Sequence, residues 1–266
     1  MPSVASVKKD LDALGTTGQE EILNYLEEVI VLGSFATEVT NEVKENRFSK
    51  GKVCPHCGHE EVSRNGKFNS KQRYICKSCR KTFTDFTRSP RYNSKKDIKK
   101  WILYSKCMIN GYSIRKCAEI VGISVPTSFY WRHKFLDAIR VYMGIGNVGG
   151  VIEVDETFFR ESFKGNHKKS TTFIMPREPH KRGKHKEGIY HIQHINAFHS
   201  KLKEWMYSFH SVATKYLANY MYWFKWLQFF NTEKDTVKTK HLLVQSHTSH
   251  SDTKLKDFKI REAIYI

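Results

Sequence analysis

Apolar residues recur at helical spacing in three parts of the chain. In residues 20–33 they fall on one face of a predicted helix: Ile22, Leu23, Leu26, Val29 and Ile30. Residues 95–140 show the same periodicity, and so do residues 196–230, which are rich in aromatic side chains. The large residues of the third part are Trp205, Tyr216, Tyr220, Trp223, Phe224, Trp226 and Leu227. Such spacing is more typical of a core than of a base-stacking platform, so we expect these side chains to be buried.

Residues 95–140 divide into three predicted helices. Asn110-Gly111 ends the first. Ser113 is a suitable N-cap for a short second helix, and Gly122 marks the turn that follows it. Ser124 caps the third helix. We expect the two free cysteines of this region, Cys107 and Cys117, to be buried as small apolar residues.

Strand-like segments are short and separated by polar turns. Residues 72–76 and 81–86 are aromatic-containing strand candidates within residues 47–90. A glycine-rich linker over 144–150 precedes a β-branched and aromatic strand candidate at 151–159. The polar residues that follow position 231 are expected to be loosely ordered until the last few positions.

The distribution of charge adds a candidate partner. Residues 1–46 hold three Lys and nine Asp or Glu, a net charge of −6, whereas residues 47–135 hold 21 Lys or Arg and five Asp or Glu, a net +16. A basic block of this kind indicates nucleic-acid binding. Charge alone is also compatible with a solvated basic surface, with ribosome binding or with membrane-surface binding.

Four of the six cysteines form two pairs, Cys54-Pro-His-Cys57 and Cys76-Lys-Ser-Cys79. Two such pairs supply four thiolates for a tetrahedral zinc ion, and the eighteen residues between them suit a β-hairpin. The sequence therefore predicts a structural zinc ribbon, with Gly58 in the first turn. His56 and His59 are surplus to the four ligands.

Candidate DNA contacts lie on the ribbon and on the third helix of the 95–140 region. On the ribbon we assign Arg73, Lys77, Arg80 and Lys81 to duplex DNA. The segment 111–135 has the outline of a helix-turn-helix, in which Ala118 lies where two helices cross. Its third helix is expected to present Thr127, Ser128, Tyr130, Arg132, His133 and Lys134, of which Thr127, Ser128, Arg132 and Lys134 are assigned to DNA. The alternative is an ordinary three-helix bundle.

The order of motifs resembles the ISXO2-like (IS1595) family of insertion-sequence transposases. The motifs are CPHCG, YICKSC, VIEVDETFF, FKGNHKK, MPREPHKRG and HINAFHSKLKEWM. The resemblance runs from about residue 47 onward. It implies an RNase H-like, DDE-type catalytic domain that uses Mg²⁺ for strand cleavage and transfer. By position, Asp155 corresponds to the first catalytic residue, Asn196 to the third, and Lys203 to a DNA-contacting lysine beside it.

The second catalytic Asp of that family has no counterpart here. No Asp occurs between Asp155 and Asn196, and beyond Glu156, which adjoins Asp155, the acids of this interval are Glu161, Glu178 and Glu187. The order of the motifs is consistent with an internal deletion near Lys181-Arg182-Gly183. Because a two-metal site needs several converging carboxylates, we expect little or no transposition activity.

These observations predict an α+β multidomain chain. The expected parts are a helical segment (1–46), a zinc ribbon (47–90), a helix-turn-helix region (91–143), an incomplete RNase H-like domain with a helical C-terminal part (151–230) and a C-terminal tail (231–266). The expected partners are transposon-end DNA and a second or full-length transposase chain. Without an apolar run of eighteen residues or a secretory leader, a cytoplasmic location away from membranes is expected.

Two other functions remain open on the sequence alone. One is a DNA-binding regulator without catalysis, built on the ribbon and the helix-turn-helix. The other is a small metal-dependent nuclease that uses Asp155 and one of the three glutamates.

Overall fold

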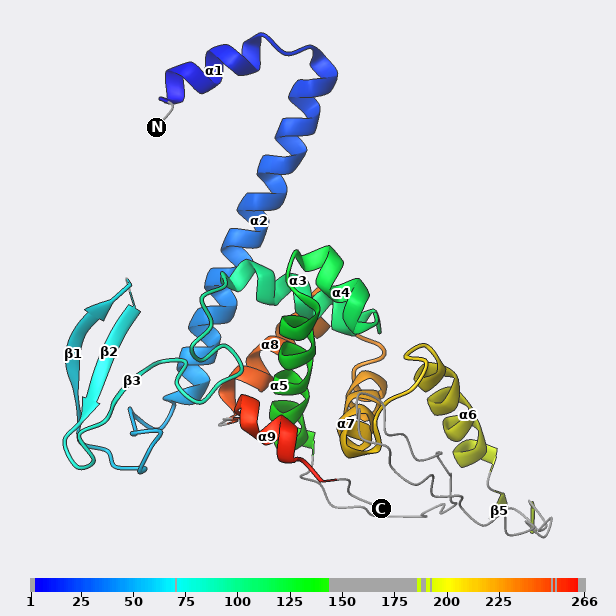
Figure 1. The fold of residues 1–266 in the computed structure, drawn as a ribbon. Helices are drawn as coiled ribbons and strands as arrows, with labels where there is room; N and C mark the ends of the chain where they lie inside the picture. Colours follow the sequence, from blue (N-terminus) through cyan, green and yellow to red (C-terminus); the bar gives the residue numbers. More distant parts are fainter. Residues whose placement is uncertain are drawn as a thin grey trace.

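A single long helix, α2 (Thr16–Arg47), links the N-terminal region to the rest of the molecule. The computed structural model describes residues 3–69, 71–143, 186–187, 190–191, 193–249, 251 and 253–262. The short helix α1 (Val4–Asp12) precedes α2, and together they project from the body as an arm (Figure 1). The C-terminal half of α2 packs against the body through Ala36, Val39 and Val43, which are buried. The predicted helix over 20–33 is confirmed as part of this longer one.

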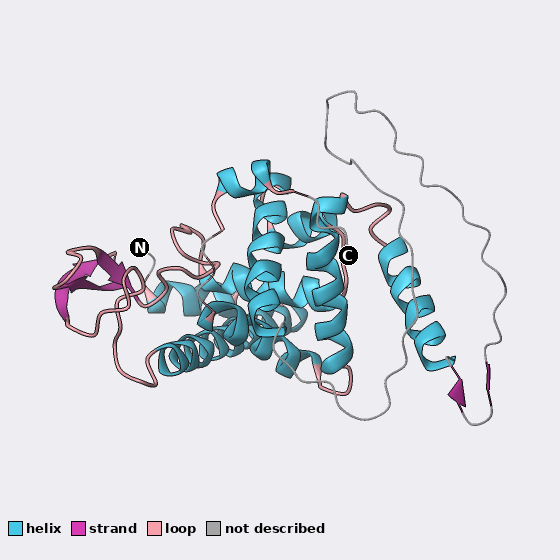
Figure 2. Cartoon of the chain, turned by 90° about the horizontal axis from the view of Figure 1, so that it is seen from below, coloured by secondary structure: helices cyan, strands magenta, loops and turns pink. Residues whose placement is uncertain are grey.

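A small antiparallel sheet follows α2. Its strands are β1 (Val62–Phe68), β2 (Lys71–Cys76) and β3 (Thr82–Thr84), in the order β1-β2-β3. In the register of the sheet, Tyr74 of β2 pairs with Arg64 of β1 and with Phe83 of β3. Tyr74 and Phe83 stack with ring centroids 5.5 Å apart and form a small core with two cysteines, Cys54 and Cys76. Figure 2 shows this sheet at one end of the helical body.

The helical body is built around α3 (Ile98–Ile109), α4 (Ile114–Val121) and α5 (Val125–Met143). The predicted caps are confirmed: the Ser113 hydroxyl accepts from the Lys116 amide, and the Ser124 hydroxyl accepts from the Thr127 amide. Gly122 adopts φ 64° at the end of α4, a left-handed conformation that suits glycine at a helix C-terminus.

Helices α6 (Gln193–Tyr207), α7 (Thr214–Phe229), α8 (Asp235–Thr248) and α9 (Leu255–Ile260) complete the described fold. A two-residue hairpin precedes them, with β4 (Lys186–Glu187) paired to β5 (Tyr190–His191). Five of the predicted aromatic residues of α7 are buried, and two of them, Trp223 and Trp226, are fully inaccessible. Trp205 and Leu227 are half-buried, and Phe229 at the end of α7 is 72% exposed. The buried five are Tyr216, Tyr220, Trp223, Phe224 and Trp226. Trp223 and Trp226 share the core with Trp101 of α3, which stacks on Trp131 of α5 at 3.8 Å between ring centroids.

The expectation of a loosely ordered tail after residue 231 is wrong. Helix α8 packs against α2, α3 and α5, and its Leu242 and Leu243 belong to the central core. The sequence of this segment looks polar, but its Thr239 and Ser246 can be buried because their hydroxyls donate to carbonyls one turn back in the same helix. A polar side chain that is satisfied in this way loses little by burial.

Two buried histidines lie in this core. Burial is the largest influence on His247 and lowers its pKa to about 3, and the neighbouring Arg91 and Arg47 act in the same direction. Burial likewise lowers the pKa of His133 to about 3. Both imidazoles are therefore neutral in the folded protein at neutral pH.

This pair makes stability depend on pH. Between about pH 6.5 and pH 3 the unfolded chain binds protons on these side chains that the native chain excludes. The free energy of unfolding therefore decreases as the pH falls below about 6.5, by at most about 1.4 kcal/mol per pH unit for each histidine. We expect the unfolding free energy of His247→Leu, measured by chemical denaturation at pH 7 and pH 5, to decrease less with falling pH than that of the unmodified protein, because one of the two buried histidines is absent. His210→Asn, at an exposed position, should leave the slope unchanged. Equal slopes in all three proteins would contradict the assignment.

Candidate metal centre and nucleic-acid interface

Two tight turns bring the four predicted metal ligands together. In the first turn the Gly58 amide donates to the Cys54 carbonyl at 2.8 Å, and Gly58 has φ 77°. In the second the Arg80 amide donates to the Cys76 carbonyl at 3.0 Å, and Arg80 has φ 57°. Each CxxC pair is thus followed by a left-handed residue that closes the loop. The local sequence CxxC-Gly provides for this in the first turn, as predicted.

The four sulfur atoms are positioned to share one ion. The Sγ atoms of Cys54, Cys57, Cys76 and Cys79 all lie within 4.8 Å of one another. Cys54 and Cys79 have their sulfurs 3.7 Å apart, and Cys57 and Cys76 have theirs 3.6 Å apart. Zn–S bonds of about 2.3 Å in a tetrahedron place sulfurs about 3.8 Å apart, so the arrangement fits such an ion. The four close cysteines could therefore bind a metal such as zinc.

The two histidines of this region stay outside the sulfur group, as expected. The His59 Nδ1 accepts a hydrogen bond from the Glu61 amide at 3.2 Å, and neither imidazole belongs to the cluster. At Cys76 the Cys79 amide is the largest influence and lowers the pKa of the thiol to about 7. At Cys57 the His59 amide lowers the pKa, but desolvation and the three other thiols raise it to about 12. A bound cation would favour the thiolate form of all four.

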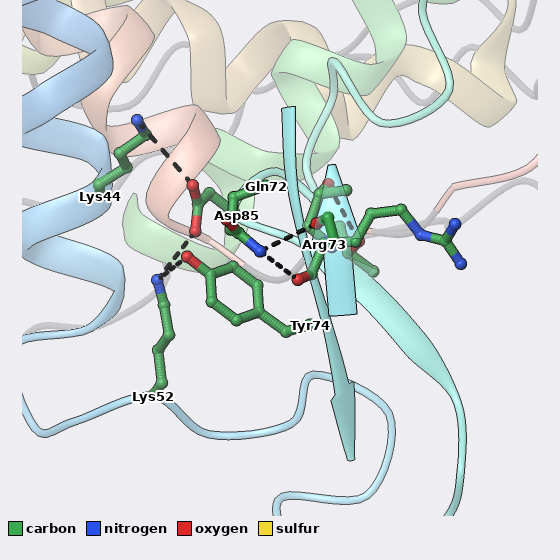
Figure 3. A network of polar contacts seen from close by, with 9 residues as sticks. Lys44, Lys52, Gln72, Arg73, Tyr74 and Asp85 are labelled. Carbon is green, nitrogen blue, oxygen red and sulfur yellow. Dashed lines mark hydrogen bonds and ion pairs between the residues drawn. The ribbon is translucent and has the colours of Figure 1, made fainter. Parts of the chain in front are cut away.

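A polar network fixes the ribbon against α2 (Figure 3). The Lys52 ammonium donates to the Tyr74 hydroxyl at 2.7 Å and pairs with Asp85 at 3.1 Å. Lys44, on α2, approaches the same carboxylate at 3.9 Å. Asp85 thereby links the strand end, the chain leading into the ribbon and the long helix. Sequence reasoning gave these residues no role, since their partners are distant in the chain.

The ribbon cations assigned to DNA occupy the second cysteine turn and the adjoining strand. Lys77, Arg80 and Lys81 are exposed around this turn. Arg73 on β2 is half-buried, and its guanidinium lies 3.5 Å from the Thr82 hydroxyl. Three of the four cations therefore face solvent on one turn of the metal cluster.

On α5 the predicted contact residues separate into two groups. Thr127 and Lys134 are half-buried on the outer side of the helix, and the Thr127 hydroxyl lies 2.8 Å from that of Ser124. Tyr130 is also half-buried. These positions lie along one side of the helix at spacings of three and four residues.

Ser128 and Arg132 require a correction, because both are fully buried and do not face a ligand. Ser128 donates to the Ile114 carbonyl at 2.8 Å. Arg132 donates to the Tyr112 carbonyl and to the Cys117 sulfur, and its guanidinium lies 5.0 Å from the ring centroid of Trp223.

The burial of these two side chains follows from the face on which they lie. Positions 128 and 132 share the inner face of α5 with Phe135 and Ile139, which are fully buried. His133, also expected on the surface, is buried beside Tyr216 with ring centroids 4.1 Å apart. The helical spacing of Ser128 and Arg132 from Phe135 and Ile139 is the sequence signal from which their burial could have been predicted. Cys107 and Cys117 are buried as predicted.

The family-implied catalytic residues are not brought together in the described part of the chain. Asp155 and the strand candidate at 151–159 lie outside the described residues. Asn196 and Lys203 are both exposed on α6, seven residues apart. Helix α6 begins at Gln193, so Asn196 lies in its first turn. Among the described residues the structure gathers no group of three or more carboxylates.

Within the described residues, no helix has both the length and the apolar character needed to cross a bilayer.

The fold and the cysteine cluster define a mixed α/β protein with a metal-type site on a small three-stranded sheet. The chain is similar to an uncharacterized protein in the transposable element ISH50 of Halobacterium salinarum, with 31% identity over 130 residues. The match covers 48% of this chain and 43% of that protein, so the chain spans less than half of its relative's length. No protein-family model and no solved structure matches the chain.

Metal content tests the cysteine cluster directly. Purified protein should contain about one equivalent of zinc per chain. Cys76→Ser removes one of four ligands and should lower zinc affinity at least about 100-fold, measured by competition with a chromogenic chelator. Cys107→Ser, which alters a buried thiol of the helical core, is the matched control and should retain the metal. Loss of zinc in both variants, or in neither, would contradict the assignment.

Proposed function

We propose that this chain is a transposase-related protein of an insertion sequence that binds duplex DNA at the ends of its element. The observation that carries the proposal is the placement of exposed cations on a turn of the four-cysteine cluster. Similarity to a protein of the transposable element ISH50 supports the insertion-sequence context. The finer assignment, to the ISXO2-like (IS1595) transposases, rests on the motif order in the sequence.

In this proposal zinc has a structural role. Four thiolates fill the coordination sphere of the ion and leave no position for a substrate. The ion therefore stabilises the fold of the ribbon and takes no part in a reaction. With the turn fixed, Lys77 and Lys81 sit on a rigid element that can follow a phosphate backbone. Phosphate contacts of this kind set affinity and orientation and carry no sequence information.

We assign α4 and α5 to a helix-turn-helix that reads the major groove. In such motifs the first residues of the second helix contact base edges. Here the first turn of α5 is the accessible part, with Ser124, Val125 and Pro126 exposed and Thr127 half-buried. Lys134, two turns further along, is the candidate phosphate contact on the same side. Ser128 and Arg132 serve the fold instead.

For catalysis we propose a defect. Phosphoryl transfer by a DDE-type site depends on several anionic ligands that hold two Mg²⁺ ions. The sequence offers Asp155 and the neutral Asn196, and no Asp lies between them. A chain that binds element ends without cleaving them would act as a regulator, competing with a complete transposase or associating with it.

Salt dependence of binding tests the DNA interface. Full-length protein should bind a 30-base-pair duplex with an affinity that falls steeply as salt rises. Lys77→Gln/Lys81→Gln should reduce the slope of log K against log salt by about 1.8, since each lost phosphate contact removes about 0.9. Lys8→Gln/Lys9→Gln removes the same charge from the acidic arm and should leave the slope unchanged. Binding without salt dependence, or equal effects of both pairs, would reject the interface.

A further inference from the structure

Helix α9 docks on the side of α5 where the proposed recognition residues lie. Its Phe258 is buried, with its ring centroid 5.4 Å from that of Tyr130 and 6.1 Å from that of Phe129. The Tyr216 hydroxyl of α7 donates to the Phe258 carbonyl at 3.1 Å. Figure 1 shows α9 beside α5. A segment that was expected to be loosely ordered is thus anchored next to the second turn of α5.

A single carboxylate, Asp137 of α5, secures the segment on both sides of α9. The Thr253 hydroxyl, just before α9, donates to Asp137 Oδ2 at 2.7 Å. The Arg261 guanidinium, just after α9, pairs with the same oxygen at 2.8 Å. Asn219 of α7 donates to the other oxygen at 2.7 Å. Since only 12% of the Asp137 side chain is exposed, these contacts are shielded from solvent and hold α9 in one place.

The docked segment presents positive charge. Lys254 and Lys256 are exposed, and a third lysine follows at position 259. The one acid of α9, Asp257, accepts from the Lys254 amide at 2.7 Å, where it caps the start of the helix. Phe258 is buried against Phe129 and Tyr130, whereas Lys254 and Lys256 are exposed and follow directly after Thr253, which is bonded to Asp137 of α5. A segment with exposed cations, more than 110 residues further along the chain, is therefore held against the middle of α5.

We propose that α9 is a second phosphate-contacting element, held on α5 by Phe258 and Asp137, which extends the DNA-binding surface past the recognition helix. The inference rests on the proposed DNA-binding function and deepens it. Lys254 and Lys256 contact the backbone that flanks the groove entered by α5. The opposite role, a strap that covers α5 and blocks DNA, conflicts with the charge, because a competing cover would be anionic like the nucleic acid it replaces.

A double-mutant cycle in the full-length protein tests this proposal. Lys254→Gln/Lys256→Gln removes the charges, Phe258→Ala removes the anchor, and a third protein carries all three changes. The readout is affinity for a 30-base-pair duplex at about 0.1 M salt. The charge variant should bind at least about ten-fold more weakly, with a salt slope smaller by about 1.8. Phe258→Ala should lose a similar amount, and the combined protein should be no weaker than Phe258→Ala.

Two results would overturn the proposed role of α9. Tighter binding by Phe258→Ala would show that α9 is a cover and would overturn the proposal. Unchanged binding by Lys254→Gln/Lys256→Gln, a surface change that leaves the core intact, would also overturn it, even if Phe258→Ala failed to fold. Lys8→Gln/Lys9→Gln serves as the charge-matched control. If the unmodified chain binds no duplex at low salt, the proposed function itself fails. If Lys77→Gln/Lys81→Gln weakens binding and the α9 variant does not, only the role of α9 fails.

Discussion

One guanidinium joins three parts of this protein that are far apart in sequence. Arg47, the last residue of α2, donates to the Thr87 carbonyl at 2.5 Å and to the His247 carbonyl at 2.6 Å. Thr87 lies in the ribbon just after β3, and His247 lies in the last turn of α8, where a cation also stabilises the carbonyl end of a helix. Burial lowers the pKa of Arg47 to about 10, so the group keeps its charge at neutral pH. The ribbon and the helical body are therefore held in one arrangement.

In the proposed function, this arrangement lets the metal cluster position cations for DNA. The cluster shapes a turn that carries Lys77, Arg80 and Lys81, and Asp85 connects the sheet to α2 through Lys44 and Lys52. Within the helical body, Asp137 and Phe258 fix α9 against α5. Cations from separate segments are thus presented by elements whose positions are set by buried contacts. In this account a rigid scaffold holds a discontinuous phosphate-binding surface.

Features encoded by a few neighbouring residues could be predicted from the sequence. The CxxC pairs, the caps Ser113 and Ser124 and the turn at Gly122 depend on local backbone chemistry, and the structure contains each of them. Features that depend on partners distant in the chain could not be predicted from the sequence. Helix α8 has a polar sequence, yet it is buried because its hydroxyls bond within the helix and its Gln245 accepts from the Trp226 indole at 2.7 Å. Arg132 looked like a DNA contact because a charged residue is usually exposed, whereas the surrounding aromatic rings and carbonyls receive it here.

The most direct test of the account is lysine footprinting of the intact protein with an amine-reactive reagent, with and without duplex DNA, read residue by residue by mass spectrometry. The account predicts that DNA protects Lys77 and Lys81 on the ribbon together with Lys256 on α9, while Lys8 and Lys9 on the arm react equally in both states. Protection confined to one of these segments would contradict a single discontinuous surface. Protection of the arm in place of the ribbon and α9 would contradict it as well.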